Sequence, residues 1–393
     1  MISFAWQNRL QNQADERRAL GRARAILPPG GLDFCSNDYL GLRCDPRLAE
    51  AAGAAARSFG AGSGAARLLR GDCPLHQELE ATLAQWKGTE ACLLFNTGFQ
   101  ANATLIPALL GRGDAVFSDA LNHASLVDGC RLARSGGARV GIFRHRDTGD
   151  LDGQLVAWRA EAPAEAVALV ATDAVFSMDG DAADLPALIE VCDRHGALLL
   201  IDEAHATGLL GSDGAGLAQF QGVHGRVPLV MGTLGKGIGA FGAFVCCPEV
   251  LREHLLNTAR GFIFSTALPP PVLGAALEGI RLARAEPWRR ERALALAGRL
   301  RQALGHRPRP HRPGCRGRLH RPDPPGTGLR RARRAPPHGA RRHRPPADHH
   351  RGPPGRCGGG HPDRRPGRVP AFSGQQYLTQ KATIRNLGPG APS

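Results

Sequence analysis

Residues 197–208, ALLLIDEAHATG, decide the fold, because an apolar run of strand length ends there in a carboxylate and a glycine turn. Three further runs have the same form: AVALVATDAVFS (166–177), PLVMGTLGK (228–236) and GAFVCC (242–247). Between two of them, DLPALIEVCDRHG (184–196) has apolar residues at helical spacing. Strand patterns that alternate with helical patterns predict an α/β protein built on a largely parallel sheet.

The same alternation begins further upstream. Residues 46–59 and 73–87 have apolar positions at helical spacing, and ACLLFNTG (91–98) predicts a short buried strand that ends in a glycine turn. Polar residues gather where the predicted strands end. Ligands of open α/β sheets bind at the carboxyl ends of the strands, so we expect the functional site there.

Two of these strand ends carry unusual chemistry. Asp202 ends one strand with His205 on the turn after it, and Thr233 and Lys236 lie in the glycine-rich turn after another. Taken singly, such an Asp is more often a helix cap and such a Lys a solvated surface residue. Together with the backbone amides of residues 97–99, however, they supply a Schiff-base amine, a pyridinium partner and a phosphate cradle, which are the groups that pyridoxal phosphate (PLP) requires.

The net charge of +15 is confined to the C-terminal part of the 393-residue chain. Residues 1–305 hold 30 basic and 32 acidic residues, whereas residues 306–393 hold 20 basic and 3 acidic residues. Residues 306–370 contain 18 Arg, 15 Pro and 8 His, with no Lys, Glu, Ile, Phe, Tyr or Trp. Such a composition predicts disorder, because too little apolar surface is available for burial.

Arginine without lysine, joined to Pro, Gly, Ala and His, is also typical of a GC-rich gene read out of frame. We therefore hypothesise a frameshift near Gly305; the alternative is a natural tail that binds RNA or another polyanion. His349 and His350 in this segment lack spaced acidic or cysteine ligands, so no metal site is predicted. An undisturbed reading frame through codon 305 would refute the frameshift.

Several classes of protein are disfavoured. The ten cysteines include no C-x-x-C pair, the N-terminus has no apolar signal-peptide core, and no segment approaches the roughly 20 apolar residues of a membrane helix. We expect a cytoplasmic protein that binds neither membrane nor nucleic acid. Residues 237–242 match G-x-G-x-x-G, but the AFVCC that follows predicts a strand where a dinucleotide site requires a helix.

Eight segments follow one another in an order that is similar to the α-oxoamine synthase family of PLP enzymes. They are FCSNDYLGL (34–42), GSGAARLLRGDCPLHQELE (62–80), NTGFQAN (96–102), SDALNHASLVDG (118–129), FSMDGDAADL (176–185), IDEAHATGLLG (201–211), GTLGKGIGAFGAFV (232–245) and FIFSTALPP (262–270). The resemblance covers about residues 10–300. The last four segments resemble the 8-amino-7-oxononanoate synthases more than the 5-aminolevulinate synthases or 2-amino-3-ketobutyrate ligases.

The resemblance implies a fold-type I PLP transferase, whose large, mostly parallel mixed sheet is flanked by helices. It implies an N-terminal helix and substrate-contacting segment over residues 1–45, a large PLP-binding domain over 46–285 and the start of a small C-terminal α/β domain over 286–305. That small domain is expected to be largely missing or disordered here, with residues 306–393 out of frame. It would carry an arginine for the substrate carboxylate, which we do not find in this sequence.

The resemblance also implies roles for single residues. Lys236 would form the Schiff base and then act as the base, Asp202 would keep the pyridine nitrogen protonated, and His123 would stack on the ring. His205 and Ser177 would bond the ring O3′. Phosphate donors would be Gly98, Phe99 and Thr233. Substrate contacts would come from Asn37, His123 and Arg24, the last in a basic N-terminal helix where Arg17, Arg18 or Arg22 could replace it.

The implied reaction joins L-alanine to a pimeloyl thioester, carried by CoA or acyl carrier protein, with loss of CO₂. The product would be 8-amino-7-oxononanoate, a biotin precursor, made by a homodimer. The alternatives are another α-oxoamine synthase activity, or a polyanion-binding protein that uses its basic tail. The out-of-frame tail implies an impaired activity.

Overall fold

The computed structural model describes residues 2–26 and 30–303. The Arg/Pro/His-rich segment, its expected disorder and the hypothetical frameshift at Gly305 lie outside the described residues and stay predictions. Within those residues no helix is long and apolar enough to cross a membrane.

A seven-stranded sheet forms the centre of the fold, in the order β1-β7-β6-β5-β4-β2-β3. Its strands are β1 (Ala91–Phe95), β2 (Ala115–Asp119), β3 (Arg139–Phe143), β4 (Ala168–Asp173), β5 (Leu198–Asp202), β6 (Leu229–Thr233) and β7 (Ala243–Cys247). Strands β6, β5, β4, β2 and β3 pair in parallel. The predicted mixed, mostly parallel sheet is confirmed.

Strand β7 is the reversed strand that makes the sheet mixed. It pairs antiparallel with both β6 and β1. The short connection between β6 and β7 explains this direction, because a parallel crossover needs about a dozen residues or more. Because β7 alone among the described strands is reversed, the carboxyl end of β1 lies at the same edge of the sheet as the carboxyl ends of β4, β5 and β6.

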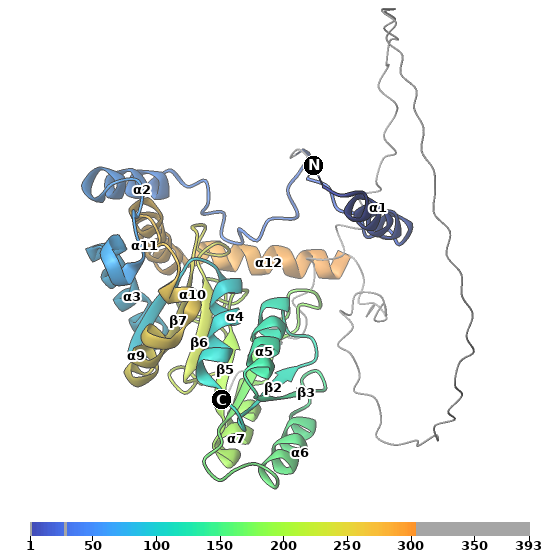
Figure 1. The fold of residues 1–393 in the computed structure, drawn as a ribbon. Coiled ribbons are helices and arrows are strands. Elements are labelled where there is room, and N and C mark those ends of the chain that lie inside the picture. Colours follow the sequence, from blue (N-terminus) through green and yellow to red (C-terminus); the bar gives the residue numbers. More distant parts are fainter. Residues whose placement is uncertain (1, 27–29, 304–393) are drawn as a thin grey trace, which may run out of the picture. The chain divides into compact units, whose positions relative to one another are not determined.

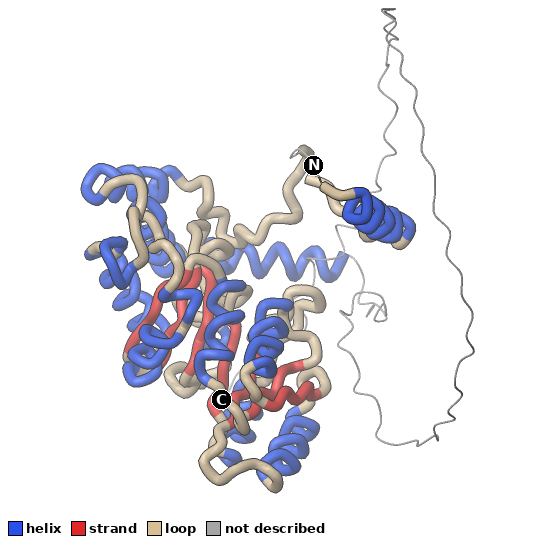
Figure 2. Tube along the Cα trace, in the orientation of Figure 1, coloured by secondary structure: helices blue, strands red, loops and turns tan. Residues whose placement is uncertain are grey.

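Helices cover both faces of the sheet. They are α1 (Phe4–Ala19), α2 (Pro46–Phe59), α3 (Pro74–Lys87), α4 (Gly98–Leu109), α5 (Ala124–Ser135), α6 (Thr148–Arg159), α7 (Leu185–His195), α8 (Leu217–Phe220), α9 (Glu249–Thr258), α10 (Arg260–Ile263), α11 (Pro270–Ala285) and α12 (Pro287–Ala303), with a π-helical turn η1 (Arg67–Gly71). Figure 1 shows α4 and α5 over one face, and Figure 2 shows the strands between helices. The helices predicted at 46–59, 73–87 and 184–196 are confirmed to within two residues.

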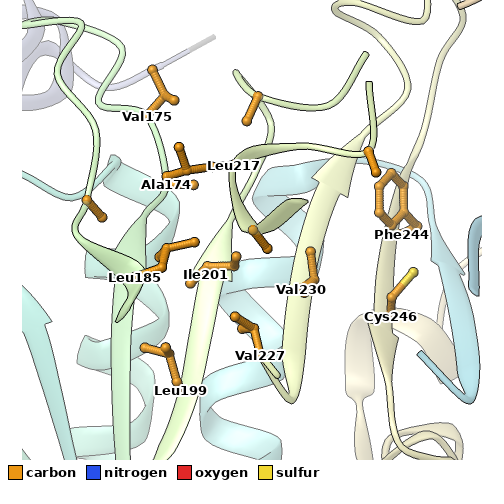
Figure 3. Close-up of a cluster of buried hydrophobic side chains, with 14 of the residues drawn as sticks. Ala174, Val175, Leu185, Leu199, Ile201, Leu217, Val227, Val230, Phe244 and Cys246 are labelled. Atoms are coloured by element: carbon orange, nitrogen blue, oxygen red, sulfur yellow. The ribbon is translucent and has the colours of Figure 1, made fainter. Parts of the chain in front are cut away.

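The alternation of side chains along each strand builds two apolar layers. On one face Leu199 and Ile201 of β5 join Val230, Phe244 and Cys246, and Figure 3 shows these side chains gathered with Leu185 and Leu217. On the other face Leu200 and Met231 pack with residues of α4, α5 and α10. Because Asp202 follows Leu200 by two residues, its side chain belongs to the face covered by α4 and α5.

The N-terminal helix is shorter than expected. Helix α1 ends at Ala19, and Arg24 lies beyond it in an exposed segment without regular structure. The expectation that Arg24 belongs to the basic helix was therefore wrong. Glycine ends the helix: Gly21 has a φ of 63°, which is unfavourable for residues with a side chain.

Candidate active site

Three polar residues end neighbouring strands on the same face of the sheet. Asp173, Asp202 and Thr233 are the last residues of β4, β5 and β6, and each follows by two residues a side chain of the apolar layer under α4 and α5. Asp173 lies directly opposite Asp202 in the parallel pairing. The predicted cluster of polar groups at the strand ends is thus present, and its orientation follows from the strand period of two.

The Asp202 carboxylate is buried, with 6% of the residue exposed. Its Oδ2 accepts a hydrogen bond from Asn102 Nδ2 at 2.8 Å, and its Oδ1 accepts one from the Ala204 N–H at 2.9 Å. Asn102 lies on α4 and also donates to Ser125 Oγ of α5 at 3.0 Å. The two helices therefore fix the direction of the carboxylate through neutral donors, which leaves it suited to pair with a protonated ring nitrogen.

A second buried carboxyl group adjoins the first. Burial, and next the nearby charge of Asp202, raises the pKa of Asp173 well above its usual value. Asp173 Oδ2 accepts from the His123 N–H at 2.9 Å, and its own N–H donates to Asn122 Oδ1 at 2.8 Å. Asp173 thereby fixes the start of α5, where the His123 side chain is exposed and its Nδ1 lies 2.7 Å from Ser125 Oγ.

The amine of Lys236 belongs to a continuous hydrogen-bonded chain. Lys236 Nζ lies 2.8 Å from His205 Nε2, and His205 Nδ1 lies 2.7 Å from Tyr39 Oη. The Tyr39 hydroxyl in turn lies 3.3 Å from Asn37 Oδ1. An ammonium group can only donate, so each of the next groups can donate onward and the amide oxygen of Asn37 accepts at the end. Burial raises the pKa of Tyr39 to about 12, which keeps the hydroxyl protonated.

An anion cradle lies where β1 leads into α4. Thr97 is the N-cap, and its side chain accepts from the Gln100 N–H, so the first N–H groups of α4, those of Gly98 and Phe99, are left at the helix N-terminus. Thr233 approaches closely: a Cβ added to Gly98 would lie 2.7 Å from Thr233 Cγ2. The Thr233 Oγ1 atom is buried and has no hydrogen-bond partner. A buried hydroxyl beside a helix N-terminus is a donor set for phosphate.

These residues fit PLP. The unpartnered Thr233 hydroxyl and the start of α4 match a phosphate, the buried Asp202 carboxylate matches a pyridinium, and Lys236 offers a primary amine. A side chain at position 98 would collide with Thr233, so the close packing of Thr233 against the start of α4 requires glycine there.

The structure brings most of the predicted residues to this edge of the sheet. Ser177 lies in the loop after β4 and is half-buried, and His205 is bonded by Tyr39 and Lys236. Asn37 joins the site through Tyr39, while Arg24 is exposed in the N-terminal segment.

Sequence reasoning missed three residues of the site: Tyr39, Asn102 and Asp173. Each stands inside or beside a segment that had been singled out, SNDYLGL, NTGFQAN and the run before FSMDG. Asp173 could have been found by counting, because it ends its strand as Asp202 does. The contacts of Tyr39 and Asn102 span large separations in sequence, so no local pattern reveals them.

Comparison with known proteins identifies a family and relatives of known name. Residues 29–318 match the family model described as aminotransferase class I and II. An 8-amino-7-oxononanoate synthase of Anaeromyxobacter sp. (strain K) is 56% identical over 282 residues, which cover 71% of this chain and 69% of the relative.

Solved structures agree. A serine palmitoyltransferase with its PLP internal aldimine has a TM-score of 0.69 and 32% identity, covering 78% of this chain and 80% of its own. The 8-amino-7-oxononanoate synthase of Francisella tularensis has a TM-score of 0.57 and 27% identity, covering 69% and 76%.

Proposed function

This chain belongs to the aminotransferase class I and II family, and from that premise we propose that it catalyses the condensation of L-alanine with a pimeloyl thioester to give 8-amino-7-oxononanoate. The chain is a PLP-dependent transferase of fold type I and resembles the α-oxoamine synthases. The observation that carries the proposal is the position of Lys236 Nζ beside His205, at the strand edge where Asp202 and Thr233 also lie.

Few lysines are available to form the Schiff base. The chain has three lysines, Lys87, Lys236 and Lys381. Lys87 Nζ is buried and bonds Glu203 Oε2 at 2.6 Å and Thr207 Oγ1 at 2.8 Å, so it is committed to the core. Lys236 is half-buried in a glycine-rich turn at the strand edge, which supports its role as the Schiff-base amine.

Each residue of the site then has a defined task. PLP supplies a conjugated ring that stabilises negative charge at the amino-acid Cα. Lys236 Nζ takes the proton from that carbon, and His205 orients the amine from its other side. Asp202, held by Asn102, keeps the ring nitrogen protonated. The phosphate is bound by Thr233 and by the N–H groups at the start of α4.

The remaining contacts orient the reactants. With PLP bound, His123 at the start of α5 would stack on the ring, and Ser177 and His205 would bond the ring oxygen. Asn37 and Arg24 contact the substrate. A bond forms between alanine Cα and the pimeloyl carbonyl carbon as the thiol of CoA or of the acyl carrier protein leaves. The β-keto acid then loses CO₂, and a proton returns to the same carbon.

We further propose that the active form is a homodimer, with its active sites at the subunit interface. The π-helical turn η1 and the end of α10, whose flanking segments are joined by a bridge between Ala66 and Thr266, carry exposed apolar side chains, with Leu69 77% and Phe264 69% exposed. Exposed apolar surface of this kind supports a protein interface. We also propose that the activity is impaired, because we do not find in this sequence the arginine that would bind the substrate carboxylate.

The alternative assignment is a different α-oxoamine synthase activity, because the solved relatives include serine palmitoyltransferases. The amino acid and the acyl chain distinguish the two, so product analysis with alanine, glycine and serine against pimeloyl and longer thioesters decides between them. The polyanion-binding alternative depends on residues outside the described ones.

The test is a Schiff-base mapping experiment. Purified chain is incubated with PLP, and its absorbance is recorded before and after L-alanine. In a separate sample without alanine, borohydride fixes the cofactor to its lysine for peptide mass analysis. We expect the label on Lys236, with Lys236→Ala unlabelled and Lys381→Ala labelled like the parent. A label on Lys87 or Lys381 would refute the assignment of Lys236, and the absence of any band would refute the proposed function.

A further inference from the structure

His145 forms a cluster that the proposed mechanism does not use. Its Nδ1 lies 2.9 Å from Asp119 Oδ1, and its Nε2 lies 2.8 Å from Asp181 Oδ2. Asp119 ends strand β2, whereas Asp181 belongs to the loop after β4. The His145 side chain therefore joins two segments that lie 62 residues apart in the sequence.

The geometry dictates the charge of this histidine. Both ring nitrogens face carboxylate oxygens, which can only accept, so both nitrogens must carry a proton. Burial alone would lower the pKa of His145, but the bonds to Asp119 and Asp181 outweigh it and raise the pKa to about 9. Arg146 is the other charged residue of the cluster. Its backbone N–H donates to Asp119 Oδ2 at 2.8 Å, and its guanidinium Nη1 lies 3.3 Å from Asp181 Oδ2.

The segment held by Asp181 is a narrow loop. Val175 and Ala182 form an isolated antiparallel bridge, and the Phe176 N–H donates to the Asp181 carbonyl at 2.9 Å. The His145 ring also meets Phe176 edge-on, with the ring centroids 4.5 Å apart. Ser177 follows Phe176 directly, and the loop tip at Met178 is 56% exposed. The Gly180 N–H donates to the Phe176 carbonyl at 2.7 Å and closes the turn that holds Ser177, so the bonds of His145 add to a turn with backbone bonds of its own.

The other end of the cluster leads to the ring-stacking histidine. Asp119 Oδ1 also accepts from the Leu121 N–H at 2.8 Å, which fixes the turn that leads to His123. We propose that His145, bonded through both ring nitrogens to Asp119 and Asp181, is a positioning residue that ties the Ser177 loop to the strand end leading to His123. The inference rests on the proposed function, because Ser177 and His123 are its cofactor residues.

The removal of His145 should loosen the loop and leave the core intact. His145→Gln can donate to only one of the two carboxylates. The matched control is His195→Gln, since His195 Nε2 also lies 2.9 Å from an aspartate, Asp152. His195 ends α7 just before β5 begins, at the edge of the sheet opposite Asp202.

Hydrogen exchange of the cofactor-free full chain gives the first readout. At neutral pH we expect peptides spanning 174–184 to exchange about 10-fold faster in His145→Gln than in the parent or in His195→Gln, as for the loss of one charge-assisted hydrogen bond. Equal exchange in all three chains would overturn the proposal. Because no cofactor is added, this readout is independent of the proposed function.

The second readout is the dissociation constant for PLP at pH 7.5 and pH 10. We expect His145→Gln to bind about 10-fold more weakly at pH 7.5 and the two chains to converge at pH 10, where His145 of the parent has lost its proton. Lys236 is present in both chains, so the ratio of their dissociation constants isolates His145. A ratio near one at both pH values would overturn the positioning role even if exchange differs, whereas no PLP binding by the parent would refute the proposed function instead.

A second substitution guards against misfolding. Asp181→Asn keeps His145 and its bond to Asp119 but removes one of the two charges that raise its pKa. The pH at which PLP affinity falls should then shift below that of the parent chain. An unshifted midpoint would contradict the proposed cluster.

Discussion

Lys236 Nζ and His205 Nε2 lie 2.8 Å apart, so the imidazole is the hydrogen-bond partner of the lysine amine. His205 is fixed on its other side by the Tyr39 hydroxyl at 2.7 Å. Since Lys236 lies after β6, His205 after β5 and Tyr39 before α2, three separate segments of the chain set the environment of one amine.

Tyr39→Phe should weaken this arrangement without disturbing the core. The ring is retained, but His205 Nδ1 loses its partner, so we expect the PLP affinity or the turnover to fall by about 2- to 10-fold, as for one neutral hydrogen bond. The measurement is a PLP titration over pH 6.5 to 9.5, with Tyr377→Phe as the matched control, since the chain has only these two tyrosines. An unchanged dependence of PLP affinity on pH would argue against the hydrogen-bonded chain from Lys236 to Asn37.

Thr233→Val should separate stability from ligand binding. The Thr233 hydroxyl is buried without a partner, so replacing it with a methyl group should leave the free energy of unfolding unchanged or raise it by about 1 kcal/mol. PLP affinity should nevertheless fall about 10-fold, because a phosphate donor is lost. Urea denaturation and PLP titration measure the two effects.

Thr172→Val is the matched control for this substitution. Thr172 Oγ1 donates to the Asp173 carbonyl at 3.0 Å, so its loss should lower the free energy of unfolding by about 0.5–1.5 kcal/mol. A Thr233→Val chain that loses stability while binding PLP normally would show that the hydroxyl has a structural partner.

Asn102→Ala should destabilise the chain and weaken the cofactor site together. Asp202 Oδ2 would lose its side-chain donor in a buried setting, which costs about 1–3 kcal/mol of unfolding free energy. Asn257→Ala, whose exposed amide bonds only a carbonyl within α9, should change unfolding by less than about 0.5 kcal/mol. Similar unfolding midpoints for the two variants would contradict the role of Asn102.

Lys87 and Glu203 form a buried ion pair behind the site, with side chains 2% and 1% exposed. Lys87→Met leaves the Glu203 carboxylate buried and unpaired, so we expect a loss of about 3–5 kcal/mol of unfolding free energy. The double variant Lys87→Met, Glu203→Gln should recover part of that loss. A double-mutant cycle in urea gives the coupling, and strictly additive losses would contradict a direct pair.

Stability should depend on pH through His145. Its pKa is raised to about 9 in the folded chain, above the ordinary value of 6.5, so its contribution is complete below about pH 6.5 and is lost as the pH rises through about 9. The difference in unfolding free energy between the parent and His145→Gln should therefore be largest near pH 6 and disappear near pH 10. A difference that is constant with pH would contradict a charged His145.

Much of this protein can be read directly from its sequence. The strands around Asp202 and Thr233, the helices at 46–59, 73–87 and 184–196 and the lysine in its glycine turn all follow from periodicity and local chemistry, because each depends on neighbours within a few residues. Strand direction was only partly predictable: β7 is antiparallel because its connection to β6 is too short for a crossover.

Tertiary structure decided which groups meet. Hydrogen bonds in and around the site join segments that are far apart along the chain. Asn102 donates to Asp202, Tyr39 bonds His205, and His145 makes one hydrogen bond to Asp119 and another to Asp181. Their partners are selected by the order of strands in the sheet and by the helices that cover each face, which no local pattern encodes. The sequence by itself therefore determined the elements and the reactive residue types, whereas folding alone aligned the strand ends and so set the partner and charge of each group.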